Sequence, residues 1–106
     1  MNINNMGDVL KNANKIRKDI DRVQGELKDR YVEGKAADGL VSVLVNGQQE
    51  VVKVSIKPEA AEDIELLEDL ILAAIGQGVD KSKALKNEEI NKVTGGFGDS
   101  LAGLFF

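Results

Sequence analysis

The sequence of 106 residues contains no cysteine and no histidine. Their absence excludes disulfides, thiol nucleophiles, the usual zinc sites and the most common general base. Tryptophan is also absent, and one tyrosine and three phenylalanines are the only aromatic residues, so the core must consist of aliphatic side chains. We therefore do not expect an enzyme, a cofactor, a metal or a small-molecule substrate.

Long hydrophobic runs are absent too. No stretch approaches the roughly 18 apolar residues that span a bilayer, and the first residues lack the apolar run of a signal peptide. We therefore expect a cytoplasmic protein without a membrane partner. One domain is expected, at residues 1–94, and its thin core would gain from sharing an interface with a second copy of the chain.

Charge is distributed unevenly around a net value of −4. Residues 1–30 contain seven Lys or Arg and five Asp or Glu, residues 31–80 contain three against ten, and residues 81–106 contain four against three. Because one face of a protein does the binding, a negative total does not exclude a nucleic-acid partner.

Apolar residues at alternating intervals of three and four predict a long N-terminal helix over residues 5–28. They are Met6, Val9, Ala13, Ile16, Ile20, Val23 and Leu27. Such a helix would extend about 35 Å, longer than a small sheet is wide. Part of it should project from the body, and its apolar seam needs a partner.

Three antiparallel strands are predicted between this helix and Pro58, and Asn46-Gly47 is typical of a hairpin turn. Regular alternation predicts two rows of side chains on the core face: Val41, Val43 and Val45 opposite Val52, Val54 and Ile56. Behind them, Leu40, Leu44 and Val51 mix with polar residues, which fits a subunit interface.

A second helix is predicted after Asp63, which is placed to cap it. Its two apolar stripes indicate burial on two sides, and we assign one of them, Leu66, Leu70 and Ala73, to the dimer interface. Gly76 and Gly78 predict a kink, followed by an exposed arm to about Val93. Residues 95–106 are expected to form a flexible Gly-rich tail, so the predicted order is αβββα, an α+β fold.

Two further patterns do not indicate a catalytic or phosphate-binding site. Carboxylates gather around Asp63, but a helix N-terminus attracts acids through its dipole, and no nearby His or Cys indicates catalysis. The segment GGFGDS near the C-terminus lacks the strand, the helix and the Gly-Lys-Ser/Thr of a phosphate-binding loop.

A basic stripe is predicted on the first helix, formed by Lys11, Lys15, Lys18 and Arg22. These residues fall within about 60° of one another and about 160° from the apolar seam. The stripe fits either the solvated face of an amphipathic helix or a phosphate-binding surface. More cations, Lys81, Lys83, Lys86 and Lys92, follow on the second helix.

Residues 40–74, LVSVLVNGQQEVVKVSIKPEAAEDIELLEDLILAA, resemble the YbaB/EbfC family of bacterial nucleoid-associated proteins. The shared features are the double-Val strand, the Asn-Gly turn, the Ile-x-Pro strand end and the Leu-Glu-Asp-Leu…Ala-Ala helix. The resemblance implies a tweezer-like homodimer whose helical arms engage double-stranded DNA. By position, the DNA-binding candidates are Lys11, Lys15, Arg17, Lys18, Arg22, Lys81, Lys83, Lys86 and Lys92.

The combined hypothesis is a nucleoid-associated, DNA-binding dimer with modest sequence preference that affects nucleoid organisation and gene expression. Its alternative is a protein-interaction adaptor whose helical arms bind another protein. The heptad seam and the apolar residues of the tail favour the adaptor, and the basic stripe favours DNA.

Overall fold

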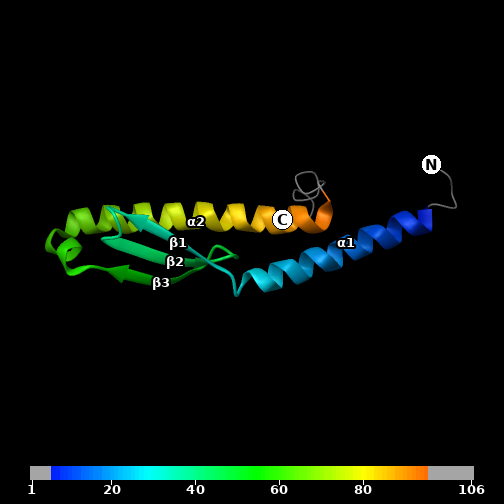
Figure 1. The fold of residues 1–106 in the computed structure, drawn as a ribbon, viewed down its shortest axis with the longest axis horizontal. Coiled ribbons are helices and arrows are strands. Elements are labelled where there is room, and N and C mark those ends of the chain that lie inside the picture. The colour runs from blue at the N-terminus through cyan, green and yellow to red at the C-terminus, as the bar shows by residue number, and fades with distance from the viewer. Residues whose placement is uncertain (1–5, 96–106) are drawn as a thin grey trace.

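The computed structural model describes residues 6–95, and its element order is the predicted αβββα (Figure 1). The elements are α1 (Met6–Leu27), β1 (Tyr31–Ala36), β2 (Val41–Asn46), β3 (Val51–Ile56), the 3-10 helix η2 (Pro58–Glu62) and α2 (Ile64–Thr94). The α+β class is confirmed. The expected tail, beyond Gly95, lies outside the described residues.

The three strands form one antiparallel sheet in the order β1-β2-β3. Val43 pairs with Val54, as predicted. A β-bulge then places Val51 opposite Val45, where regular alternation predicted Val52. The prediction was wrong at this end because a bulge sets two residues against one and breaks the two-residue period.

The main core lies between the sheet and α2. The three valines of β2 are buried with Ala60 and Ala74. Gly34 of β1 and Gly78 of α2 let the helix backbone lie directly on the strand. A Cβ on Gly34 would collide with the Ala74 carbonyl oxygen and lie 2.6 Å from the Gly78 nitrogen. This close approach requires glycine on the strand, because any side chain there would push α2 away.

The third strand lies outside this core, which corrects the prediction for its apolar row. Val52, Val54 and Ile56 are 50%, 44% and 43% exposed. α2 packs on β1 and β2 and barely reaches β3. A helix about 10 Å wide covers only about two strands spaced about 4.8 Å apart, so one helix leaves the third strand open.

The second helix runs unbroken through Gly76 and Gly78, so the predicted kink is wrong (Figure 1). Each glycine disfavours a helix by about 1 kcal/mol, but the packing of Gly78 against the sheet offsets that cost. Asp63 caps the helix as predicted, because its Oδ1 accepts a hydrogen bond from the Leu66 nitrogen at 3.2 Å.

The second half of α2 packs against α1 and forms a separate small core. Val23 and Leu27 of α1 are buried with Ile90 of α2, and Leu85 and Val93 pack against them. The exposed arm predicted for this part of α2 is therefore wrong. Ile90, Leu85 and Val93 of α2 provide the partner that the C-terminal half of the α1 seam required.

The N-terminal half of α1 extends past the end of α2 (Figure 1). Along it, burial decreases from Ile20, which is 1% exposed, through the half-buried Ile16 to Leu10, which is 62% exposed. Part of α1 thus projects from the body, as predicted. We call residues 10–18 the α1 arm.

Candidate nucleic-acid interface

The basic stripe of α1 points away from the body. Its four members, Lys11, Lys15, Lys18 and Arg22, are all exposed. The opposite side of the helix carries the buried residues Ile20, Val23 and Leu27. The packing of one side against α2 therefore fixes the outward direction of the other, as the helical period predicted.

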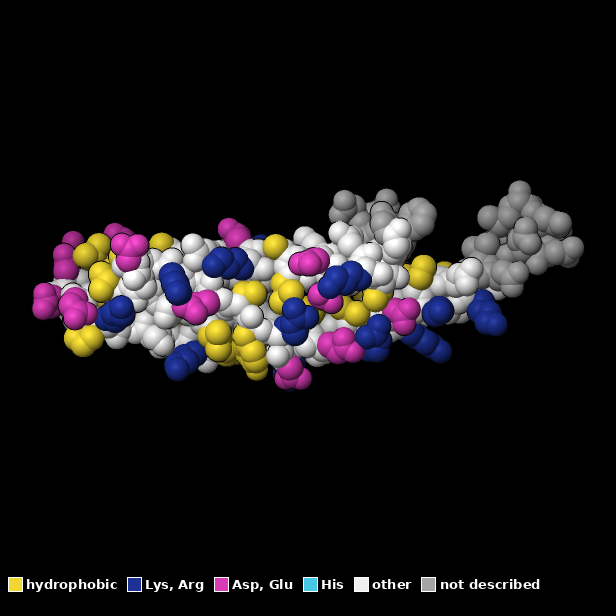
Figure 2. Space-filling model, in the orientation of Figure 1, with side chains coloured by type: hydrophobic (Ala, Val, Ile, Leu, Met, Phe, Trp, Pro, Cys, Tyr) yellow, Lys and Arg dark blue, Asp and Glu magenta, His cyan; other side chains and the backbone are white. Residues whose placement is uncertain are grey.

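The α1 arm has cations and no carboxylate: Lys11, Lys15, Arg17 and Lys18. The acids Asp19, Asp21 and Glu26 come later, in the part of α1 that lies beside α2. Figure 2 shows Lys and Arg gathered towards the projecting end of the molecule and Asp and Glu at the opposite end. The fold thus places a cationic surface at the α1 arm although the net charge of the chain is −4.

Two arginines of α1 differ from the lysines of the stripe. Arg22 Nη1 lies 2.9 Å from Glu26 Oε1, in an exposed ion pair one turn apart. Arg17 is rotated by about 130° from the middle of the stripe. Lys11, Lys15 and Lys18 are therefore the cations that share one face of the arm.

The four lysines of α2 do not form a single face. Lys81 Nζ donates to the Glu33 carbonyl oxygen of β1 at 2.9 Å, and Lys92 Nζ donates to Glu89 Oε1 at 2.8 Å. Lys83 and Lys86 are rotated by about 140–160° from Lys81. The structure therefore groups the cations of α1 but not those of α2.

Glu89 holds two cations where α2 passes the end of α1. Its Oε1 lies 2.8 Å from Lys92 Nζ and 3.7 Å from Arg30 Nη1. The hydrogen bond from Lys92, with the charges of Lys92 and Arg30, lowers the pKa of Glu89. The same hydrogen bond raises the pKa of Lys92. Arg30 is thereby linked to α2 just after α1 ends.

The lowered pKa of Glu89 predicts a pH-dependent effect of Glu89→Gln. Because the folded-state pKa is depressed, the carboxylate contributes stability above its ordinary range, and this contribution disappears as pH falls through the lowered value. In chemical denaturation the variant should be less stable than the wild type at pH 7, and this difference should disappear in acid, below the lowered pKa of Glu89. Glu88→Gln, a neighbouring exposed change of the same charge, is the matched control, and a Glu89→Gln deficit that persists in acid would contradict the prediction.

The residues predicted for a dimer interface lie in separate places. Leu44, half-buried, is on the sheet face away from α2, and Val51 is 39% exposed at the start of β3. Leu40 and Leu70 pack partly against the core of the same chain. Leu66 is 48% exposed and Ala73 is also exposed.

The stripe of Leu66, Leu70 and Ala73 faces the β1 side of α2. Its neighbours on the helix, Gln77 and Lys81, form hydrogen bonds with the β1 backbone. These three residues therefore do not join the sheet candidates in one continuous patch.

An apolar surface that sequence reasoning missed lies along β3. Val52, Val54 and Ile56 remain open on the side that faces α2, and the nearby helix exposes Leu72 to 72%. Figure 2 shows hydrophobic side chains at the surface near β3. The sequence predicted one helix to cover three strands, and because a helix is only about two strands wide, an uncovered strand could have been expected.

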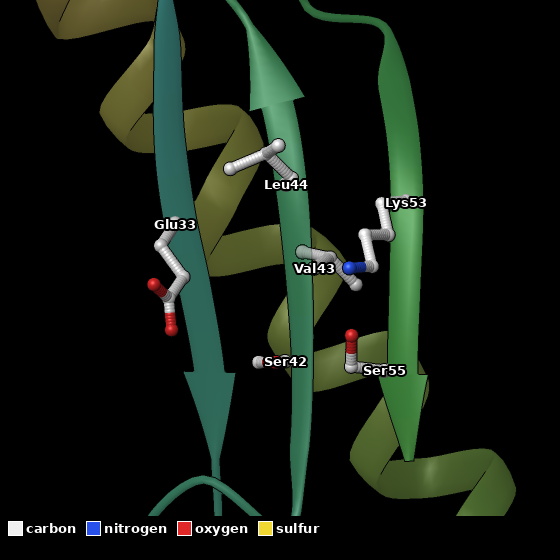
Figure 3. Close-up of a pocket in the computed structure, with 6 residues that line it drawn as sticks. All are labelled: Glu33, Ser42, Val43, Leu44, Lys53 and Ser55. Carbon is white, nitrogen blue, oxygen red and sulfur yellow. The ribbon is translucent and has the colours of Figure 1, made fainter.

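The opposite face of the sheet contains a shallow hollow of about 180 Å³ (Figure 3). On this face Leu44 of β2 lies between Glu33 of β1 and Lys53 of β3, and α2 lies behind the sheet. The lining combines two aliphatic residues, Val43 and Leu44, with two charged residues and two serines. This mixture fits a covered protein surface better than a ligand pocket, because ligand pockets are mainly apolar and enclosed.

Within residues 6–95, no group of three or more acidic residues is arranged to hold a metal ion. No helix in the same range is both long and apolar enough to cross a membrane.

Comparison with known proteins identifies the fold and the family. A crystal structure of an uncharacterized protein from Helicobacter pylori superposes with a TM-score of 0.68 at 24% identity, covering 83% of this chain and 91% of that one. The chain is 42% identical over 103 residues to a nucleoid-associated protein of Acetivibrio thermocellus, a match covering 95% of this chain and 90% of that protein. A nucleoid-associated protein of Pelotomaculum thermopropionicum is 40% identical, with 95% and 96% covered. Residues 1–97 match the YbaB/EbfC DNA-binding family, and the chain therefore belongs to that family.

Proposed function

We propose that this protein binds duplex DNA as a homodimer and that its α1 arms contact the phosphates. One observation carries the proposal: the arm presents Lys11, Lys15 and Lys18 on one exposed face, with no carboxylate between residues 10 and 18. Membership of a DNA-binding family supports duplex DNA as the ligand of this cationic arm. Phosphate oxygens on a duplex present the complementary charge.

Phosphates rather than base edges should dominate the contacts. Lysine is a flexible point charge, whereas base reading usually depends on bidentate Arg, Asn or Gln. Phosphate contacts position a protein on DNA but carry little sequence information. We therefore propose a modest sequence preference, with effects on nucleoid organisation and gene expression that arise from occupancy of many sites.

A second copy of the chain should cover the open parts of the sheet. The apolar row of β3 and the exposed Leu72 form a surface that α2 of the same chain does not reach. We include this row in the proposed dimer interface, together with the candidates predicted from sequence: Leu40, Leu44, Val51, Leu66, Leu70 and Ala73. Pairing would give the dimer two α1 arms.

The salt dependence of DNA binding tests the proposed mechanism. If each chain neutralises about four phosphates, a dimer neutralises about eight, and log affinity should fall against log salt with a slope near −7. Sedimentation of the protein with a fluorescent duplex at several salt concentrations measures this slope and the stoichiometry together. A flat response would refute phosphate binding, and stoichiometric protein partners that persist in nuclease-treated lysate would favour the adaptor alternative.

A further inference from the structure

The turn between β2 and β3 contacts the end of α1 through its backbone. The Gly47 nitrogen donates to the carbonyl oxygens of Leu27 and Arg30, at 2.8 Å each. Gln48 Nε2 donates to the Gln24 carbonyl oxygen at 2.8 Å. Together these bonds hold the last turn of α1 and the residues that follow it.

The same turn is fixed to α2 by one buried hydroxyl. Ser82 is completely buried, and its Oγ donates to the Asn46 carbonyl oxygen at 2.6 Å. That Oγ also accepts hydrogen bonds from the Gln49 backbone nitrogen at 3.2 Å and from Gln49 Nε2 at 3.0 Å. The turn therefore bridges the two long helices.

Internal hydrogen bonds make the turn rigid. Asn46 is 3% exposed, and its Oδ1 accepts from the backbone nitrogens of Gln48 and Glu50, at 3.0 Å each. Its Nδ2 donates to Glu50 Oε1 at 3.0 Å. The residue with a left-handed backbone is Gln49, at φ 63°, and not the glycine. The Asn-Gly pair thus serves a different purpose from the simple two-residue turn that the sequence predicted.

Gly47 is needed because α1 lies against it. A Cβ at this position would lie 2.6 Å from the Leu27 carbonyl oxygen and 2.8 Å from Leu27 Cβ. Any side chain would therefore push the end of α1 away from the turn. Glycine permits this close approach of two backbones.

We propose that Gly47, Gln48 and Ser82 are positioning residues that set the angle of the α1 arm for DNA binding. This inference rests on the proposed function of the arm. Lys11 lies about 24 Å along the helix axis from Leu27, so a tilt of about 10° at the turn moves it by about 4 Å. That shift is a large part of the minor-groove width of about 6 Å, so the stripe would lose register with the phosphates.

Gly47→Ala tests the inference because it disturbs the angle without changing charge. Gln48→Ala is a second variant, at an exposed residue, and it removes one hydrogen bond to α1. If Gly47→Ala does not fold, Gln48→Ala tests the inference in its place. Gly25→Ala on α1 is the matched control, because its Cβ would meet nothing within 4 Å. Since the chain has no cysteine, Asn12→Cys and Asn87→Cys provide the only sites for a donor and acceptor dye.

Each positioning variant should lower DNA affinity at least about tenfold at about 0.1 M salt. The slope of log affinity against log salt should become shallower by about 2 per dimer, because each arm loses one phosphate contact. The dye distance within one chain, measured after dilution with unlabelled protein, should change in these variants and not in Gly25→Ala. Loss of stability alone would leave the distance and slope of the folded protein unchanged. If wild-type and variant proteins share the same affinity, slope and distance, the inference is wrong. If the wild type itself binds without salt dependence, the proposed function fails instead.

Discussion

Reversing the charge of the basic stripe of α1, with all four members changed to Glu, should abolish retention of duplex DNA and leave the fold and the proposed dimer intact. The stripe faces away from both cores, so the change removes no packing contact. It does remove about four cationic contacts per chain and places carboxylates against phosphates. Because each lost contact lowers affinity about eightfold at about 0.1 M salt, a dimer with eight fewer contacts loses all measurable electrostatic binding. Electrophoretic retention of a labelled duplex measures the loss.

A charge-preserving exchange is the control for this variant. Changing the three lysines of the stripe to Arg and Arg22 to Lys keeps four cations on the same face. Because phosphates accept hydrogen bonds from either side chain, this exchanged protein should retain DNA within a few-fold of the wild type. If the charge-reversed protein still binds at the original affinity, the DNA site lies elsewhere on the molecule.

Local patterns in the sequence predicted most of the fold. The heptad spacing placed the first helix at residues 5–28, against Met6–Leu27 in the structure. Asp63 was identified as the cap because an Asp side chain can accept from a free backbone N–H at a helix start. Pro58 was expected to end the sheet, and β3 ends at Ile56. Each of these features depends on neighbouring residues alone, which is why one sequence could reveal it.

The errors concern contacts between distant parts of the chain. Gly78 was expected to weaken its helix, but its lack of a side chain is what lets α2 lie against β1. Ile90 lies in the segment that was predicted to be an exposed arm, but it packs against Val23, which is 67 positions earlier in the chain. Local spacing does not show which distant surface a residue meets, so such pairings could not be derived.

For the candidate site, too, the sequence predicted the features that depend on local spacing and not those that depend on distant contacts. The outward face of the basic stripe followed from the helical period, because one seam determines the opposite side. The helical period also separates Lys83 and Lys86 from Lys81, but it could not show that Lys81 bonds to β1 or that Lys92 bonds to Glu89. The role of Gly47 was also hidden, because its contact with Leu27 joins a turn to a helix 20 residues away.

Two carboxylates on the open row of β3, Val54→Asp with Ile56→Asp, should convert the proposed dimer to monomers. Both positions lie on the side of the sheet that faces α2 but beyond the reach of that helix, and they are 44% and 43% exposed in a single chain. Covering two unpaired carboxylates in an interface costs several kcal/mol, so the dissociation constant should rise by at least about 10³-fold. Sedimentation equilibrium measures the change, and Ala61→Asp with Ala84→Asp, two exposed alanines outside β3, is the charge-matched control. A variant that remains dimeric at micromolar concentration would exclude the β3 row from the interface.

The same variant links assembly to DNA binding, because a monomer has one arm where the dimer has two. Its salt slope should fall to about half of the dimer value, from near −7 to near −3.5, even though every cation of the stripe is intact. A monomer that kept the full slope would mean that one chain supplies all the phosphate contacts. In that case the second copy would stabilise the fold without contributing to the site. A halved slope would instead show that covering the open strand is what brings two cationic arms to one duplex.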